Sequence, residues 1–206
     1  MTNVKTLSKV IAIALLAAGS TQATAEETAP STATVKVQNA FDLAQVTGID
    51  FGTIRVTSDI GTATATAEVA TVTIYANGDS PSADSKVKAS AQVIVDGAAA
   101  TYTIAKVAPF SKLELTLPAD DAVTLKAASA PSETSNFLLS GFEAYITSGA
   151  NKGKAYAAKN LAADSEGNVT FSVGATLKTD KRGTEGAITA YVDGDYTGTF
   201  DVVVSY

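Results

Sequence analysis

The sequence contains no cysteine, no histidine and no tryptophan, and it has a single methionine. Cysteine and histidine carry most nucleophilic, acid–base and zinc chemistry in proteins. Their absence excludes thiol catalysis, Ser–His–Asp triads, haem ligation by histidine and Cys/His zinc sites. Only chemistry by carboxylate, lysine, tyrosine or a hard metal ion remains open to this chain.

Small side chains dominate the composition. Of the 206 residues 46% are apolar, but 38 residues are alanine and a further 28 are threonine. We therefore expect a thin core of small residues. Because the chain has no cysteine, no disulfide can reinforce that core, so stability must come from burial and from hydrogen bonds between strands.

The first 25 residues have the layout of a secretory signal peptide. Lys5 and Lys9 precede an apolar run from Val10 to Ala18, and Ala23-Thr24-Ala25 supplies a small-x-small cleavage site. The apolar run has roughly half of the about twenty residues that a membrane-spanning helix needs. We therefore predict export, with the signal peptide over residues 1–25, and a protein that is secreted, periplasmic or displayed on a bacterial surface.

Cleavage makes the chain more acidic. The whole sequence carries a formal net charge of −6. Without Lys5 and Lys9, 13 basic residues remain against 21 acidic ones, a net charge of −8. Binding to nucleic acid or to anionic lipid relies on clustered lysine and arginine. We therefore expect neither as a partner, and no membrane span in the mature protein.

After a leader over residues 26–32 that we expect to be disordered, hydrophobicity alternates with a period of two. This period is typical of strands with one buried face and one wet face, as in antiparallel sheets. We predict an all-β fold, an antiparallel β-sandwich of about nine or ten strands in a single domain over residues 33–206. The clearest alternating sets are Val35 and Val37; Leu113, Leu115 and Leu117; Val169, Phe171 and Val173; and Phe200, Val202, Val204 and Tyr206.

Turn residues separate these runs. Asp96-Gly97, between Lys86–Val95 and Ala98–Ala105, predicts a hairpin, because both residues tolerate the positive φ of a type I′ turn. Asp193-Gly194 is interpreted in the same way. The stretch over residues 149–167 leaves two alternatives open, a loop or one short helix within Lys152–Ala163.

Oxygen-rich turns are the candidates for a metal site. Asp164, Glu166 and Asn168 surround one glycine, and Asp193 and Asp195 flank another. Carboxylate and amide oxygens are the ligands that calcium takes, although these residues also suit turns without any metal. We therefore regard the five residues as weak calcium candidates and expect no cofactor.

No residues in the sequence form a recognisable catalytic set. Asp120 and Asp121 are neighbours, so on a strand their side chains point to opposite faces and cannot jointly flank one bond. We therefore predict no enzymatic activity and no catalytic residues. Seven tyrosines are scattered along the chain, and an exposed row of them would suit stacking on sugars.

The sequence resembles a family of exported bacterial proteins known as domain of unknown function 4402 (DUF4402). The resemblance implies an immunoglobulin-like sandwich, secreted or surface-displayed, without an assigned activity. The matching segments are Ala33–Phe41 with Asp50–Ile54 at the front, and Val173–Leu177 with Gly194–Phe200, running into Val202–Tyr206, at the back.

The last strand, Thr197–Tyr206, also resembles the terminal strand of pilins, which alternates in the same way and carries an aromatic residue close to its end. This second resemblance implies a filament subunit. Val35 and Val37 then belong either to an extension that pairs with a neighbour or to the first strand of the domain itself.

These features together predict a non-enzymatic structural or adhesive protein that acts through sheet edges and loop tips. The alternative is a soluble binding module for a glycan or for calcium.

Overall fold

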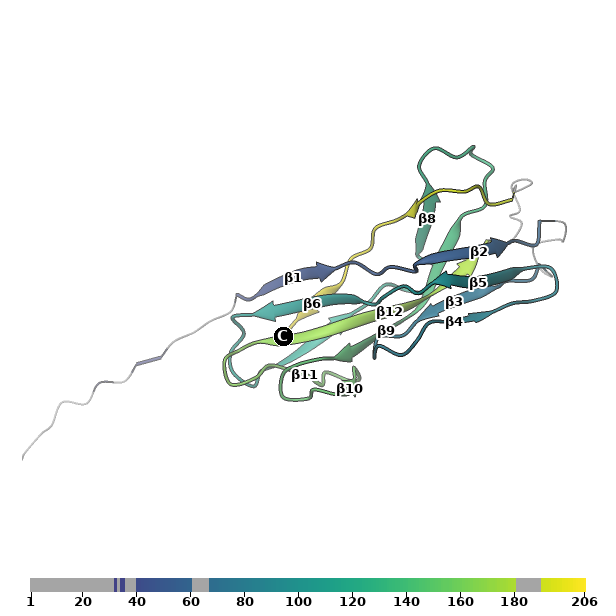
Figure 1. Cartoon of the computed structure of the whole chain (residues 1–206). Helices are drawn as coiled ribbons and strands as arrows, with labels where there is room; N and C mark the ends of the chain where they lie inside the picture. Colours follow the sequence, from purple (N-terminus) through teal and green to yellow (C-terminus); the bar gives the residue numbers. More distant parts are fainter. Residues whose placement is uncertain (1–31, 33, 36–39, 61–66, 181–189) are drawn as a thin grey trace, which may run out of the picture. The chain divides into compact units, whose positions relative to one another are not determined.

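The computed structural model describes residues 32, 34–35, 40–60, 67–180 and 190–206. The predicted signal peptide and nearly all of the predicted leader lie outside these residues. All the strands fall within one unit, Gln38–Tyr206 (Figure 1).

The all-β class predicted from the sequence is confirmed, since the described residues form strands and no helix. Consistently, none of them belongs to a helix with the length and apolarity to cross a bilayer. The described residues form fourteen strands in place of the predicted nine or ten, and three of them, β10, β11 and β13, have only two residues each. In chain order they are β1 (Asp42–Thr47), β2 (Thr53–Thr57), β3 (Thr71–Ile74), β4 (Ser82–Asp84), β5 (Ser90–Val95), β6 (Ala100–Ala105), β7 (Lys112–Thr116), β8 (Val123–Ala127), β9 (Phe137–Ile146), β10 (Lys154–Ala155), β11 (Leu161–Ala162), β12 (Val169–Thr179), β13 (Tyr196–Thr197) and β14 (Val203–Ser205).

All strand pairs among the described residues are antiparallel. The large sheet has the order β1-β6-β12-β9-β8-β13, and β10 pairs with β9 at the side. β12 is long enough to pair with two strands along one edge. β6 pairs with its first half and β3 with its second half, and β4 pairs with the other edge of β3. Two small sheets, β11-β7-β14 and β2-β5, form the facing layer.

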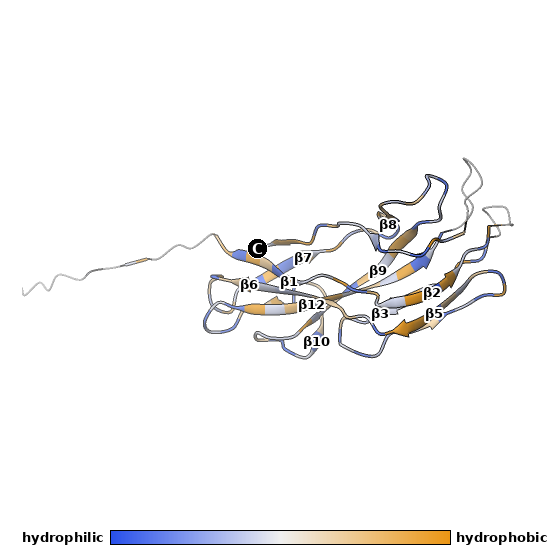
Figure 2. Ribbon diagram, turned by 45° about the horizontal axis from the view of Figure 1, so that its top comes forward, coloured by the Kyte–Doolittle hydropathy of each residue, from blue (hydrophilic) through white to orange (hydrophobic). Residues whose placement is uncertain are grey.

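Each small sheet covers its own part of the core. The first core cluster joins Leu113 and Leu115 of β7 to Tyr102, Ile146 and Phe171 of the large sheet. The second joins Ala91 of β5 and Phe51 to residues of β3, β8, β9 and β12. The two-layer packing of a sandwich follows, with alternating apolar and polar positions along the strands (Figure 2).

The expected content of small side chains in the core is observed. Nine buried core residues are alanines: Ala70, Ala76, Ala89, Ala91, Ala100, Ala144, Ala162, Ala163 and Ala175.

A bulge in β9 lets one strand serve both clusters. Phe137 and Leu139 face the second cluster at odd positions, whereas Ala144 and Ile146 face the first at even positions. This change of phase needs one extra residue, because side chains alternate strictly in a regular strand. The ladder to β12 shifts here, and Gly141 supplies the positive φ, 57°, at the bulge.

The predicted hairpin at Asp96-Gly97 is wrong. β5 pairs with β2, whereas β6 pairs with β1 and β12, so the chain crosses from one layer to the other at this point. The two chain segments approach closely at this crossing, and Gly97 makes room for the approach, because an added Cβ would lie only 2.1 Å from the backbone oxygen of Asp50. Gly52 has a matching position, with φ of 70° and an added Cβ 2.0 Å from the oxygen of Val95.

Asp193-Gly194, the second turn interpreted as a hairpin, forms a bend, and residues 190–192 directly before it are not in a strand. Of the two alternatives for residues 149–167, the short helix is absent from the described residues. Within Lys152–Ala163 the chain forms β10, β11 and a loop in which Ala158 and Lys159 have positive φ.

The C-terminal segment is divided between the layers. β13 pairs with β8 in the large sheet, and β14 pairs with β7 in a small sheet, so the single strand predicted over Thr197–Tyr206 is interrupted. Phe200, Val202 and Val204 are only partly buried, and Tyr206 is half exposed. The alternating apolar residues of this segment therefore face inward at the edge of the sandwich and do not form a fully buried strand.

The N-terminal segment changes layers too. β1 belongs to the large sheet and β2 to a small one, with the crossing at Ile49–Gly52. A bulge at Val46 interrupts the β1–β6 ladder, and one at Ile94 interrupts the β2–β5 ladder. Val35 lies outside any strand, and Val37 lies outside the described residues. The first described strand, β1, begins at Asp42.

Removal of the Phe171 ring tests the packing of the first core cluster. Phe171 is fully buried and stacks on Tyr102 with the ring centroids 5.2 Å apart. We expect Phe171→Ala to lower the free energy of unfolding by about 3–5 kcal/mol in chemical denaturation. Phe110→Ala is the matched control, because Phe110 is 65% exposed, and its effect should stay within about 0.5 kcal/mol. Equal losses for the two variants would contradict the assignment of the core.

Candidate functional site

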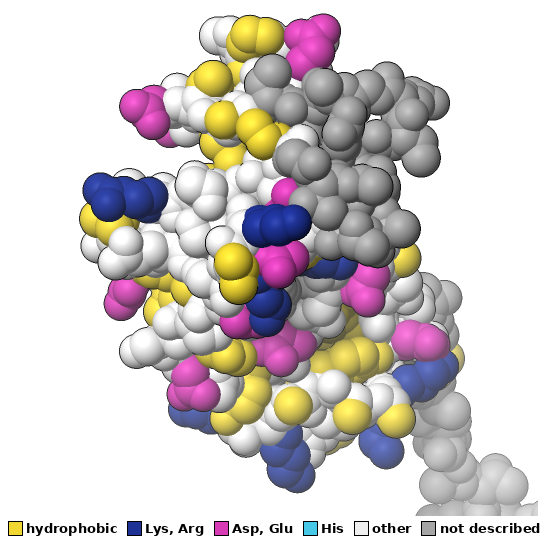
Figure 3. Space-filling view, turned by 90° about the vertical axis from the view of Figure 1, so that its right-hand side faces the viewer, with side chains coloured by type: hydrophobic (Ala, Val, Ile, Leu, Met, Phe, Trp, Pro, Cys, Tyr) yellow, Lys and Arg dark blue, Asp and Glu magenta, His cyan; other side chains and the backbone are white. Residues whose placement is uncertain are grey.

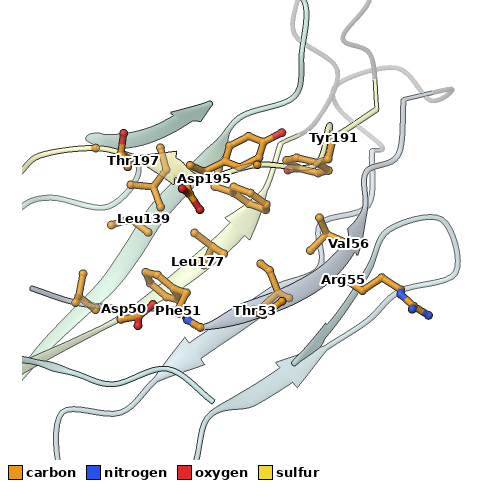
Figure 4. Close-up of a pocket in the computed structure, with 18 of the residues that line it drawn as sticks. Asp50, Phe51, Thr53, Arg55, Val56, Leu139, Leu177, Tyr191, Asp195 and Thr197 are labelled. Carbon is orange, nitrogen blue, oxygen red and sulfur yellow. Dashed lines mark hydrogen bonds between the residues drawn. The ribbon is translucent and has the colours of Figure 1, made fainter. Parts of the chain in front are cut away.

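A cleft lies where the N-terminal and C-terminal segments pass each other. One wall is formed by Ile49–Gly52 and β2, and the other by Tyr191–Gly198, which includes β13. Residues of β8, β9 and β12 form the floor. The cleft has a volume of about 970 Å³ (Figure 4).

The floor and lower walls are apolar. Phe137, Leu139 and Leu177 are buried members of the second core cluster, and Ile54 and Val56 of β2 are partly buried against it. Alternation along β2 turns these two residues inward, and Figure 4 shows Val56 on the side of Tyr191. The cleft is therefore an opening into the core from the side of the sandwich.

Three aromatic rings reinforce the C-terminal wall. Tyr191 stacks on Phe137 with the centroids 4.4 Å apart, and Tyr196 meets both rings edge-on at 5.0 and 5.8 Å. Such pairs add about 0.5–1.5 kcal/mol each beyond the area they bury. The wall is thus ordered by side-chain packing, although β13 has only two residues.

Both tyrosine hydroxyls are bonded within the chain. The Tyr191 hydroxyl accepts a hydrogen bond from the Asp180 N–H and donates one to the Asn136 carbonyl, both at 2.8 Å. The Tyr196 hydroxyl accepts one from the Val192 N–H and donates one to the Val192 carbonyl, at 3.1 and 3.2 Å. Burial raises the pKa of Tyr191 well above its ordinary value. Both hydroxyls therefore serve to hold the wall in place.

Charge at the cleft is predominantly acidic. Asp50, Asp193 and Asp195 are exposed lining residues, and Asp50 Oδ1 accepts a hydrogen bond of 2.8 Å from the Gly52 N–H. Arg55 also lines the cleft, but its side chain extends away from the opening (Figure 4). At the end of the molecule viewed in Figure 3, basic and acidic side chains are interspersed among apolar ones.

The structure keeps the weak calcium candidates apart in two places. Asp193 and Asp195 lie at the cleft, whereas Asp164, Glu166 and Asn168 share the loop between β11 and β12. Asp164 Oδ1 accepts hydrogen bonds from the N–H groups of Glu166 and Asn168, at 3.0 and 2.8 Å. This carboxylate therefore closes a turn. In the described parts of the chain, no three acidic side chains gather as metal ligands.

Most residues of the cleft escape prediction from sequence. Alternation marks Ile54, Val56 and Leu177 as inward-facing, but it does not indicate which edge of the sandwich stays open. The tyrosines near the C-terminus belong to a set that is scattered along the sequence, so their spacing does not indicate that they share a wall. A signal for the cleft exists in the Asp-Gly pairs, since Asp193-Gly194 lines it and Gly97 lies against the backbone of Asp50 in its wall.

Comparisons with known proteins return no relative. No family model, no curated protein and no solved structure matches the chain. The resemblance to the DUF4402 family therefore stays a prediction.

Replacement of Tyr191 tests the wall. Tyr191→Phe leaves the Asp180 N–H and the Asn136 carbonyl without their partner, so we expect a loss of about 1–3 kcal/mol in the free energy of unfolding. Tyr206→Phe is the control, because Tyr206 is half exposed, and it should change stability by less than about 0.5 kcal/mol.

The same variant has a pH signature. Because the pKa of Tyr191 is raised in the folded state, its contribution to stability is complete below about pH 10, where the unfolded residue begins to ionise, and is lost as the pH rises further. Denaturation curves should therefore show a shallower alkaline loss of stability for Tyr191→Phe than for the unsubstituted chain. Parallel alkaline slopes would contradict a buried, neutral hydroxyl.

Proposed function

We propose that this protein is a non-enzymatic structural or adhesive component of a bacterial surface, which associates with further copies of itself through strand edges. The observation that carries the proposal is the open side of the sandwich, by which we mean the side bounded by β1, β2, β13 and β14. Each of these four strands has a single hydrogen-bonded neighbour among the described residues.

Unpaired edges together with a route into the core are what strand addition requires. An added strand gains main-chain hydrogen bonds at the edge, and its alternate side chains fill pockets. The open side offers both, since β2 and β13 border the cleft and the floor of the cleft is apolar. The signal-like N-terminus supports export, and the absence of cysteine and histidine supports a role without catalysis.

One observation favours the alternative, a binding module for a glycan. Tyr191 and Tyr196 line the cleft, and aromatic rings stack on sugars. Their hydroxyls are already bonded to Asp180, Asn136 and Val192, which leaves fewer polar groups to orient a sugar. We therefore place self-association first.

A valine at the cleft provides the test. Val192 is 39% exposed on the C-terminal wall. Association that covers the cleft would bury it, so a lysine there would have to lose its water. For Val192→Lys we expect about tenfold weaker self-association, equivalent to about 1.4 kcal/mol, in sedimentation velocity over a range of concentrations.

Val87→Lys is the matched control. It adds the same charge at a valine that is 95% exposed and does not line the cleft, so self-association should equal that of the unsubstituted chain. A chain that stays monomeric at its highest attainable concentration would contradict the proposal. Equal weakening by both lysines would contradict the role of the cleft.

A further inference from the structure

We infer that the exposed ring of Phe110 in one copy enters the cleft of a second copy, so that copies join head to tail. This inference rests on the proposed function, and it names the surface of the neighbour that covers the cleft. Ring and cleft lie in different parts of the chain. A contact between them therefore leaves each copy able to bind a further one, as in an open filament.

Phe110 is placed at a cost that its own chain does not explain. It lies in the loop between β6 and β7 and is 65% exposed. Its φ is 58°, in the left-handed region that bulky residues rarely adopt, and Lys106 in the same loop has a φ of 65°. Among the described residues, Phe110 belongs to neither core cluster. Strain of this kind collects at binding sites, which indicates a partner for the ring.

Backbone hydrogen bonds hold this loop against the loop between β11 and β12. The Val107 N–H donates to the Gly167 carbonyl at 3.1 Å, and the Phe110 N–H donates to the Asp164 carbonyl at 3.2 Å. Gly167 allows the two loops to touch, because an added Cβ would lie 2.1 Å from the backbone oxygen of Val107. A ring on a loop that is already fixed loses little conformational entropy on binding.

The cleft presents apolar surface that its own chain leaves uncovered. Ile94 and Val192 line it and are 53% and 39% exposed, and its floor belongs to the second core cluster. Clefts of about 300–1,000 Å³ hold ligands of drug size. A volume of about 970 Å³ is therefore ample for the Phe110 ring together with Pro109.

Charge favours the same partner. Residues 106–112 contain two lysines and no acidic residue. Lys106 pairs with Asp42 at 2.6 Å, so Lys112, exposed at the start of β7, is the lysine that would face a neighbour. The aspartates of Asp193–Asp195 line the cleft. A ring followed two residues later by a lysine would therefore meet apolar walls with an acidic rim.

The bracing loop carries two acidic residues, and both carboxylates are bonded within that loop. Asp164 Oδ1 accepts hydrogen bonds from the N–H groups of Glu166 and Asn168. The Glu166 carboxylate accepts one of 2.7 Å from the Ser165 hydroxyl. Lys112 is thus the charged residue nearest to the ring along the chain.

The fold keeps the ring away from the cleft of its own chain, which Phe110 does not line. Val107 and Leu113, on either side of the ring, belong to the first core cluster, whereas the cleft opens into the second. Figure 1 shows β6 ending near the C-terminus, and β2, which borders the cleft, toward the other end. Because the loop is fixed, the ring is available to a neighbouring copy.

The absence of tryptophan gives a direct measurement of the contact. Phe110→Trp keeps a large aromatic ring and introduces a single indole. We expect its fluorescence emission to move to shorter wavelength as the protein concentration rises, because the indole leaves water. Val87→Trp is the matched control, at a valine that is 95% exposed outside the cleft, and its emission should stay constant. An emission from position 110 that stays constant while the chain associates would overturn the inference.

A mixture of two variants tests which surfaces meet. Phe110→Ala lacks the ring and keeps the cleft, whereas Val192→Lys keeps the ring and alters the cleft. We expect each variant alone to associate about tenfold more weakly than the unsubstituted chain in sedimentation velocity. At concentrations where neither associates alone, an equimolar mixture should form 1:1 dimers and nothing larger, because one intact ring meets one intact cleft.

A mixture that stays as monomeric as its components would overturn the inference. Chemical denaturation provides the control for folding, since Phe110→Ala should unfold at the same denaturant concentration as the unsubstituted chain. Phe110→Asn is the second variant, because asparagine tolerates a positive φ. It should be at least as stable as the unsubstituted chain and should associate as weakly as Phe110→Ala. Undiminished association of both variants would also overturn the inference.

Sedimentation of the unsubstituted chain separates the two proposals. If the chain associates but neither variant at position 110 weakens the association, another surface makes the contact, so the inference fails and the proposed function stands. If the chain does not associate at any concentration, both fail.

Discussion

Pairing between β9 and β12 is the interaction on which the rest of the fold depends. These two strands run side by side from the Phe171–Ile146 pair to the Thr179–Phe137 pair, and both carry residues of both core clusters. β6 and β3 follow one another along the other edge of β12. The small sheets have no hydrogen-bonded ladder in common in the described chain. Each is therefore placed by packing on the central pair.

The open side follows from this arrangement. The central pair is covered in both clusters, and unpaired edges lie on the two terminal segments of the unit, which pass each other in opposite layers. β1 and β13 belong to the large sheet, while β2 and β14 belong to the small ones. Phe41 touches Tyr206 at one end of the passage, and the cleft opens at the other. Neither terminal segment covers the other, and the core can be reached between them.

Sequence patterns predicted the class of the fold because burial on one face imposes a period of two. Leu113, Leu115, Val169, Phe171 and Val173 are all buried as their alternation indicates. The pairing of strands was not accessible in this way. Asp96-Gly97 has the composition of a tight turn, but Gly97 serves the close approach to Asp50 that lets the chain change layers. The open cleft depends on which edges stay unpaired, a property of the whole topology that local alternation does not contain.

The bulges in β1 and β5 affect how readily the strand edges can aggregate. Val46 is an extra residue in β1, and Ile94 is an extra residue beside β2, in β5. Bulges twist and bend an edge, and native proteins use them to prevent edge-to-edge aggregation. The straight parts of the open side are therefore short. An edge of this shape is too short and too bent to template the long, flat stacking of amyloid. The broken ladders therefore limit edge-to-edge aggregation where the edges are exposed.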